Sequence, residues 1–168
     1  MNWIYDTNED NSARFTLGEY GDKACKTLIC FGINPSTATP DLLDNTLKKV
    51  KTIAVNNGYL NWIMLNIYPQ RATNPNDLHI VKNDDLRKKN LEHVKKVLTE
   101  FKNSDILFAF GNLITKRDYL LELYNEIVLQ INSCGWNGKN LCIKLTKQGY
   151  PAHPLYQSGN SKLTNFIN

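Results

Sequence analysis

The sequence predicts an α/β domain in which a mainly parallel, four-stranded sheet lies between helices as a three-layer α/β/α sandwich. Four short apolar runs have the length and composition of strands that are buried on both faces, and amphipathic stretches of helical length separate them. Strands that alternate with helices in this way form parallel sheets with right-handed crossovers. The 168 residues can build one sizeable core, so we expect a single domain over residues 1–168.

The first buried strand is expected at residues 27–31, where a continuous apolar run stands between a lysine and a glycine. Ahead of it, residues 14–18 alternate weakly between polar and apolar side chains, which indicates an edge strand. After an Asn-Pro turn, residues 41–57 place apolar side chains at helical spacing and end at an Asn-Gly stop signal.

The second buried strand is expected at residues 60–67, and the two prolines of residues 68–75 predict a loop. Residues 84–102 have an apolar stripe and a lysine-rich opposite face, which is typical of a helix that covers a sheet. His93 lies beside the lysine-rich face, so we expect its side chain to be solvated.

The last third of the chain repeats this alternation. A third strand is expected at residues 106–110, a helix at 113–131 and a fourth strand at 141–145, after which a loop rich in glycine and proline begins. No internal repeat or low-complexity linker divides the chain.

Composition restricts the classes of function without selecting one. No apolar run approaches the roughly 18 to 20 residues of a membrane span. The first residues lack the basic start and apolar stretch of a signal peptide, so we expect a cytoplasmic location. The net charge of +4 permits a nucleic-acid partner but is far from the dense basic stripe that would indicate one. The four cysteines form no Cys-x-x-Cys pair, and we expect neither a metal site nor a cofactor.

Polar side chains gather in the sequence where the predicted parallel strands end. Open α/β sheets bind ligands at the carboxyl ends of their strands, so we expect a binding site at this edge. The polar side chains that would meet there are Asn34, Ser36, Thr37, Asn66, Arg71, Asn112, Lys147, His153 and Tyr156.

Several of these side chains also have ordinary structural explanations. Asn34 precedes a proline and could cap the following helix or hold a turn, and Asn66 could satisfy backbone groups of a loop. The cations Arg14, Arg71 and Lys147 could be surface charges or ion-pair partners instead of phosphate ligands.

Three motifs carry a resemblance to a known family. They read GINPSTA (residues 32–38), NIY with RATNP (66–75) and KQGYPAHPLY (147–156). On these motifs the chain resembles domain-of-unknown-function family 1643 (DUF1643), from about Arg14 to Tyr156. A family without an assigned function indicates boundaries more than chemistry.

More distantly, the order of the motifs resembles that of the uracil-DNA glycosylase superfamily, which has a Gly-x-(Asp/Asn)-Pro motif after its first parallel strand and a His-Pro motif after its last. This resemblance implies a catalytic role for Asn34, which would orient water, and for His153, which with Asn66 would hold a base. The remaining expected contacts are to the base or ligand from Ser36, Thr37, Asn112 and Tyr156, and to phosphate from Arg71, Lys147 and Arg14.

The chain departs from that superfamily at the motif after the first strand. Classical members have Asp where Asn34 stands, and an amide can orient water but cannot act as a general base. If the chain is such an enzyme, we therefore expect it to be slow. The segment after Pro154 lacks the Ser-Pro continuation, and base flipping needs a wedge or a single-stranded substrate.

The sequence therefore predicts a nucleobase-recognising protein whose partner is DNA or a nucleotide. One hypothesis is a glycosylase-like hydrolase of a modified or deaminated base. The alternative is a non-catalytic module that binds a modified base or nucleotide in a phage DNA-modification or defence context. A third possibility is that the same cleft takes another small molecule.

Overall fold

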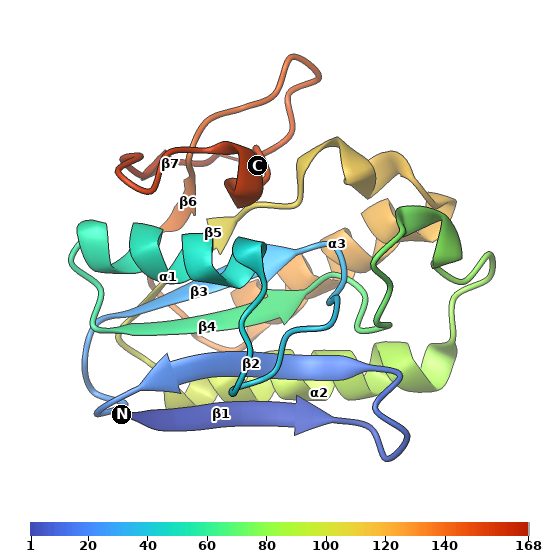
Figure 1. The fold of residues 1–168 in the computed structure, drawn as a ribbon, viewed down its shortest axis with the longest axis horizontal. Helices are drawn as coiled ribbons and strands as arrows, with labels where there is room; N and C mark the ends of the chain where they lie inside the picture. The colour runs from blue at the N-terminus through green and yellow to red at the C-terminus, as the bar shows by residue number, and fades with distance from the viewer. Residues whose placement is uncertain (168) are drawn as a thin grey trace.

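The structure is a computed structural model that describes residues 1–167, which form one mixed sheet of seven strands together with three α-helices (Figure 1). The strand order across the sheet is β1-β2-β4-β3-β5-β6-β7. The strands are β1 (Asn2–Thr7), β2 (Arg14–Tyr20), β3 (Thr27–Gly32), β4 (Asn61–Asn66), β5 (Ser104–Phe108), β6 (Asn140–Cys142) and β7 (Thr164–Asn165), and the helices are α1 (Asn45–Asn56), α2 (Asp84–Glu100) and α3 (Asp118–Ser133).

The centre of the sheet is parallel. β3 pairs in parallel with β4 on one side and with β5 on the other, and β5 pairs in parallel with β6. The α/β class is thus confirmed, but a total of four strands is wrong. β1 and β2 form an antiparallel hairpin that joins β4, and β7 runs antiparallel to β6.

β2 is not the edge strand that its weak alternation indicates. β1 pairs with it from Asn2↔Tyr20 to Thr7↔Arg14, so β2 lies inside the sheet between β1 and β4. β1 itself has exposed or half-buried side chains throughout, and no run of buried apolar residues marks it in the sequence.

Helices cover both faces of the sheet (Figure 1). Side chains from β3 and β4 alternate between the two faces: Cys30 and Met64 pack with α1, whereas Ile29 and Leu65 pack in the cluster that includes α2 and α3. This period of two places the last residues of the two strands, Gly32 and Asn66, on the α1 side of the carboxyl edge.

Two helices begin later than the apolar spacing predicts. α1 begins at Asn45 because Asp44 caps it, with Oδ1 accepting a hydrogen bond from the N–H of Leu47 at 2.9 Å. The segment predicted as one helix from residue 113 is a short 3-10 helix (Gly111–Thr115) followed by α3, since Arg117 between them has an extended backbone.

His93 is not solvated as expected. Its ring stacks on Phe15 of β2 with centroids 4.6 Å apart, and Nδ1 lies 3.5 Å from Oδ2 of Asp6 in β1. The β1–β2 hairpin covers this part of α2, and burial lowers the pKa of His93.

Candidate functional site

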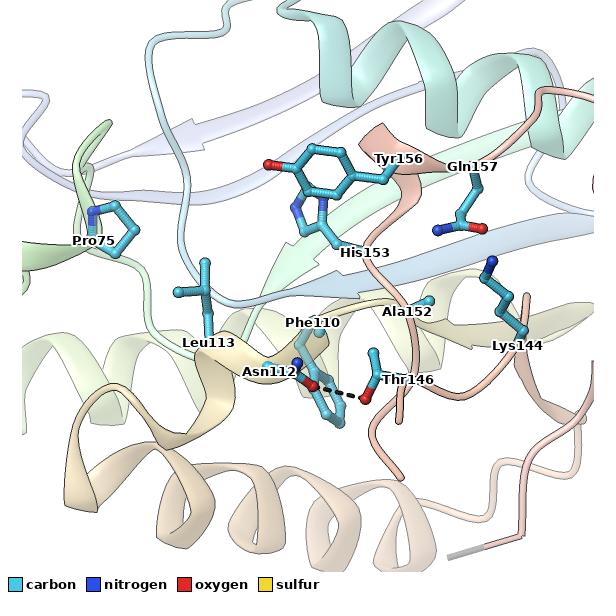
Figure 2. Close-up of a pocket in the computed structure, with 11 residues that line it drawn as sticks. Pro75, Phe110, Asn112, Leu113, Lys144, Thr146, Ala152, His153, Tyr156 and Gln157 are labelled. Atoms are coloured by element: carbon cyan, nitrogen blue, oxygen red, sulfur yellow. Dashed lines mark hydrogen bonds between the residues drawn. The ribbon is translucent and has the colours of Figure 1, made fainter. Parts of the chain in front are cut away.

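The loops that follow β5 and β6 line a first cavity of about 560 Å³ (Figure 2). It lies between the loop after β5 and the loop after β6, and Pro75 contributes from the segment beyond β4. The polar side chains that line this first cavity are Asn112, Lys144, Thr146, His153, Tyr156 and Gln157.

His153 has a defined hydrogen-bonding state in this cavity. Its Nδ1 accepts a hydrogen bond from the backbone N–H of Leu155 at 3.3 Å, so in the neutral ring the proton is on Nε2. Burial lowers the pKa of His153, and the nearby carboxylate of Asp44 opposes this shift. At neutral pH the ring is therefore uncharged and offers Nε2–H as a donor.

An aromatic ring accompanies the imidazole. The centroids of the His153 and Tyr156 rings lie 5.9 Å apart, and the ring planes are tilted by 52°. Figure 2 shows both rings on the same side of the first cavity. Tyr156 is 81% exposed, so one ring face is open to a ligand. Gly111, with φ of +63°, lies against His153, where an added Cβ would be 3.3 Å from the histidine Cβ.

Asn112 and Thr146 join the two loops across the cavity. The hydroxyl of Thr146 donates to Oδ1 of Asn112 at 2.7 Å (Figure 2), which leaves the amide Nδ2 of Asn112 as a further donor. The predicted residues Asn112, His153 and Tyr156 are thus brought together in one place.

Ser36, Thr37 and Arg71 lie elsewhere, in a second cavity of about 350 Å³ that is also lined by Asn11, Ala72 and Thr73. The hydroxyls of Ser36 and Thr73 are hydrogen-bonded at 2.9 Å. Arg71 donates to the carbonyl oxygens of Ser36 and Ala38, to the hydroxyl of Tyr5 at 2.8 Å and to Oδ1 of Asn11 at 3.2 Å. The structure therefore divides the predicted set between two cavities, and residues 72–75 contribute to both.

Asn34 connects the loops after β3 and β4. Its amide Nδ2 donates to the carbonyl oxygen of Ala72 at 2.7 Å and to that of Pro35 at 3.0 Å. Two carbonyl acceptors fix which end of the amide carries nitrogen. Asn34 is not among the residues that line either cavity.

Asn66 is fully buried, and neither side-chain Nδ2 nor Oδ1 has a hydrogen-bond partner. It ends β4 beside Gly32, where an added Cβ would lie 3.2 Å from Oδ1 of Asn66 and 2.6 Å from Cε of Met64. The missing side chain at Gly32 therefore makes room for the amide. Buried polar atoms without partners are rare in folded proteins, so they mark this position as unusual.

Arg14 is buried beside the second cavity, with 1% of its surface exposed. Its Nη1 donates to the carbonyl oxygen of Ala38 at 3.2 Å, and Arg71 donates to the same oxygen. Burial and the charge of Arg71 lower the pKa of Arg14 to about 10, opposed by the charges of Asp44 and Tyr5.

Lys147, which we expected at the binding site, lies outside both cavities, and Lys144 lines the first cavity. Lys147 is exposed in the turn that Thr146 and Tyr150 close by a backbone hydrogen bond, and it lines neither cavity. Lys144 lines the first cavity instead. Residues 141–145 look like one strand, but β6 ends at Cys142, so the last three of these residues lie beyond it.

The cavities offer amides, hydroxyls, an imidazole and cations, and neither is lined by Asp or Glu within the described part of the chain. Residues 1–167 contain no group of three or more His, Cys, Asp or Glu side chains placed to hold a metal ion, and the four cysteines are free thiols. None of the helices in this range is long and apolar enough to cross a bilayer.

Comparison with known proteins places the chain in a family without assigning it an activity. The family described as "Protein of unknown function (DUF1643)" matches residues 14–155, which include all four parallel strands. No curated protein matches the chain. Because the match covers most of the sequence, the chain belongs to the DUF1643 family.

Proposed function

We propose that this chain recognises a nucleobase, in DNA or in a nucleotide, at the carboxyl edge of its parallel strands. The observation that carries the proposal is His153. Its neutral ring presents a fixed Nε2–H donor beside the exposed ring of Tyr156. A planar polar ring can stack on an aromatic face while its carbonyl oxygen accepts a hydrogen bond from a neighbouring donor.

The other polar groups of the first cavity suit the same ligand. The amide Nδ2 of Asn112 and the ammonium group of Lys144 add donors. A volume of about 560 Å³ lies in the range of small-molecule sites, which are roughly 300–1,000 Å³. The carbonyl oxygens on the edge of a base could accept hydrogen bonds from these donors and from Nε2–H of His153.

Asn66 gives separate support. An amide with both Nδ2 and Oδ1 unpartnered can pair with one donor and one acceptor on the edge of a base. Asn66 is closed off in this structure, so its contact with a base would require the loop after β3 to move.

We also propose that the order of strands and motifs reflects a uracil-DNA glycosylase-like fold, and that the protein acts in the cytoplasm.

Hydrolysis of the N-glycosidic bond is the second candidate, and Asn34 is the residue that favours it. With Nδ2 held by two carbonyl oxygens, Oδ1 is the end of the amide that can accept a hydrogen bond from water. No carboxylate lines either cavity. The activation barrier for hydrolysis would therefore be lowered by a hydrogen bond from Nε2–H of His153 to the departing base.

Equilibrium binding and product analysis test both candidates. Uracil, hypoxanthine and modified pyrimidines would be offered as free bases, as nucleotides and within single- and double-stranded DNA, with mass spectrometry of retained ligands and released bases. We expect binding by the wild type and by Asn103→Ala, a remote control, and weakened binding by His153→Ala. If the wild type bound none of these ligands, nucleobase recognition would be wrong.

Base release separates the two candidates. Release by the wild type that is lost in Asn34→Ala, with the folded fraction of the variant verified, establishes a hydrolase. Recovery of intact ligand after prolonged incubation establishes a binding module.

A further inference from the structure

Two arginine side chains meet at the loop after β3 without a carboxylate bound to either. Nη1 of Arg14 and Nη1 of Arg71 donate to one carbonyl oxygen, that of Ala38, at 3.2 and 3.3 Å. No salt bridge within residues 1–167 includes either arginine. Arg71 also donates to Ser36, Tyr5 and Asn11, but the carbonyl oxygen of Ala38 accepts the hydrogen bond that Arg14 makes, and a carbonyl dipole is a weak partner for a guanidinium charge.

Burial makes this arrangement costly. Arg14 is almost fully buried, and its Nε has no hydrogen-bond partner. A buried cation is stabilised when an anion lies close to it, and removal from water is otherwise unfavourable. Asp44 is near enough to act on Arg14 through its charge, but its Oδ1 already caps α1. Arg14 is therefore a buried cation that no ion pair within residues 1–167 compensates.

Arg71 lines the second cavity and gives its wall a positive charge. Its other lining side chains, Asn11, Ser36, Thr37, Ala72 and Thr73, are uncharged, and three of them are hydroxyls. The backbone N–H groups of Ser36 and Thr37 take part in no hydrogen bond within residues 1–167. Hydroxyls, amides and a guanidinium group are the donors that bind phosphate in proteins.

We propose that the second cavity is a phosphate-binding site, in which Arg71 and the buried Arg14 supply positive charge. Thr37 and the one hydroxyl of the Ser36–Thr73 pair that keeps a free O–H donate hydrogen bonds. The site is distinct from the first cavity and does not involve Lys147. A phosphate monoester carries about −1.5 to −2 charges near neutral pH, and a diester carries one. Either offers the oxyanion that this cavity would bind.

The site depends on the proposed function only for the identity of the molecule that carries the phosphate. The segment 72–75 lines both cavities, with Thr73 on the second and Pro75 on the first. A nucleotide or a DNA strand is thus the natural ligand if the first cavity takes a base. Phosphate binding can nevertheless be measured without any base.

The test uses three base-free probes, inorganic phosphate, methyl phosphate and dimethyl phosphate, titrated calorimetrically into the full chain at low ionic strength. The double variant Ser36→Ala/Thr73→Val removes two hydroxyls and keeps both arginines. Thr99→Val is the control, because Thr99 is an exposed threonine of α2 that lies outside both cavities. His153→Ala perturbs only the first cavity.

We expect saturable binding of at least one probe, weakened about tenfold in the double variant and unchanged in Thr99→Val and His153→Ala. Preference for methyl phosphate identifies a monoester ligand, and comparable binding of dimethyl phosphate identifies a phosphodiester. Absence of saturable binding of all three probes, or equal affinity in the wild type and the double variant, overturns the proposal. A failure of nucleobase binding would leave these results unchanged.

Discussion

Asn34 and Ala72 are joined by a hydrogen bond of 2.7 Å from the amide Nδ2 to the backbone carbonyl oxygen. The bond ties the loop after β3 to the loop after β4, and the N–H of Ala72 returns a hydrogen bond to the carbonyl oxygen of Pro35 at 2.9 Å. Asn34 therefore has a structural role that must be separated from any role with a ligand.

Asn34→Ala should lower the free energy of unfolding by about 1–3 kcal/mol, because the carbonyl oxygen of Ala72 loses its donor in a partly buried position. Asn34→Asp should cost more, since a carboxylate would face two carbonyl oxygens. Urea denaturation measures both. Asn103→Ala removes an exposed amide that donates to the carbonyl oxygen of Ala24, and should change little. Wild-type stability in Asn34→Ala would contradict the structural role.

The free energy of unfolding should fall in acid because of two histidines. Burial lowers the folded-state pKa of both His93 and His153, so the unfolded chain binds more protons at these sites. Their contribution to stability is complete above the unfolded value of about 6.5 and is lost as the pH falls through that value toward the lowered pKa. The free energy of unfolding, measured by urea titration from pH 8 to about pH 5, should therefore decrease.

The double variant His93→Gln/His153→Gln should reduce this decrease, because it removes both titrating rings. Protonation of His153 also places a proton on Nδ1, which faces the N–H of Leu155. Binding at the first cavity should weaken over the same interval. An unchanged pH profile in the double variant would show that other groups cause the acid sensitivity.

The sequence was sufficient for the parts of the fold that bury apolar side chains. β3 and β4 read as continuous apolar runs because both of their faces are covered. Gly32 and Asn66 end these strands and therefore lie at the carboxyl edge. β1 was missed because its side chains are exposed or half-buried.

The paths of the loops were not predictable in the same way. Whether Ser36 lies with His153 or with Arg71 depends on hydrogen bonds from Asn34, Arg14 and Arg71 to backbone carbonyl oxygens. Such contacts leave no periodic signal in a sequence. Strand ends therefore predicted the edge that holds the site, but not its division into two cavities.

The two lysines after β6 provide a direct comparison. Lys144→Ala should weaken binding of an anionic ligand in the first cavity by about 1.4- to 5-fold, since a solvent-exposed charge contributes roughly 0.2–1 kcal/mol. Added salt should diminish the difference. Lys147→Ala should bind like the wild type, because Lys147 lines neither cavity. Equal losses in both variants would indicate a diffuse effect of net charge.

Two buried asparagines should respond oppositely to the same substitution. Asn66 has no side-chain hydrogen bond, whereas Nδ2 of Asn90 donates to the backbone carbonyl oxygens of Asn66 and Ile67 at 2.9 and 3.3 Å. Leucine has the same branching as asparagine and no polar atoms. Asn66→Leu should therefore leave the unfolding free energy unchanged or raised, while Asn90→Leu should lower it by about 1–3 kcal/mol.

Ligand binding should be lost in Asn66→Leu and kept in Asn90→Leu, because the unpartnered amide of Asn66 is the group that would contact a base once the loop after β3 moves. Urea denaturation and equilibrium binding on the two variants measure both effects. A stable Asn66→Leu protein that has lost nucleobase binding would mean that the amide is kept for the ligand at the expense of stability. If that variant were destabilised as much as Asn90→Leu, an ordered water would be the partner of Asn66, and its amide would be structural.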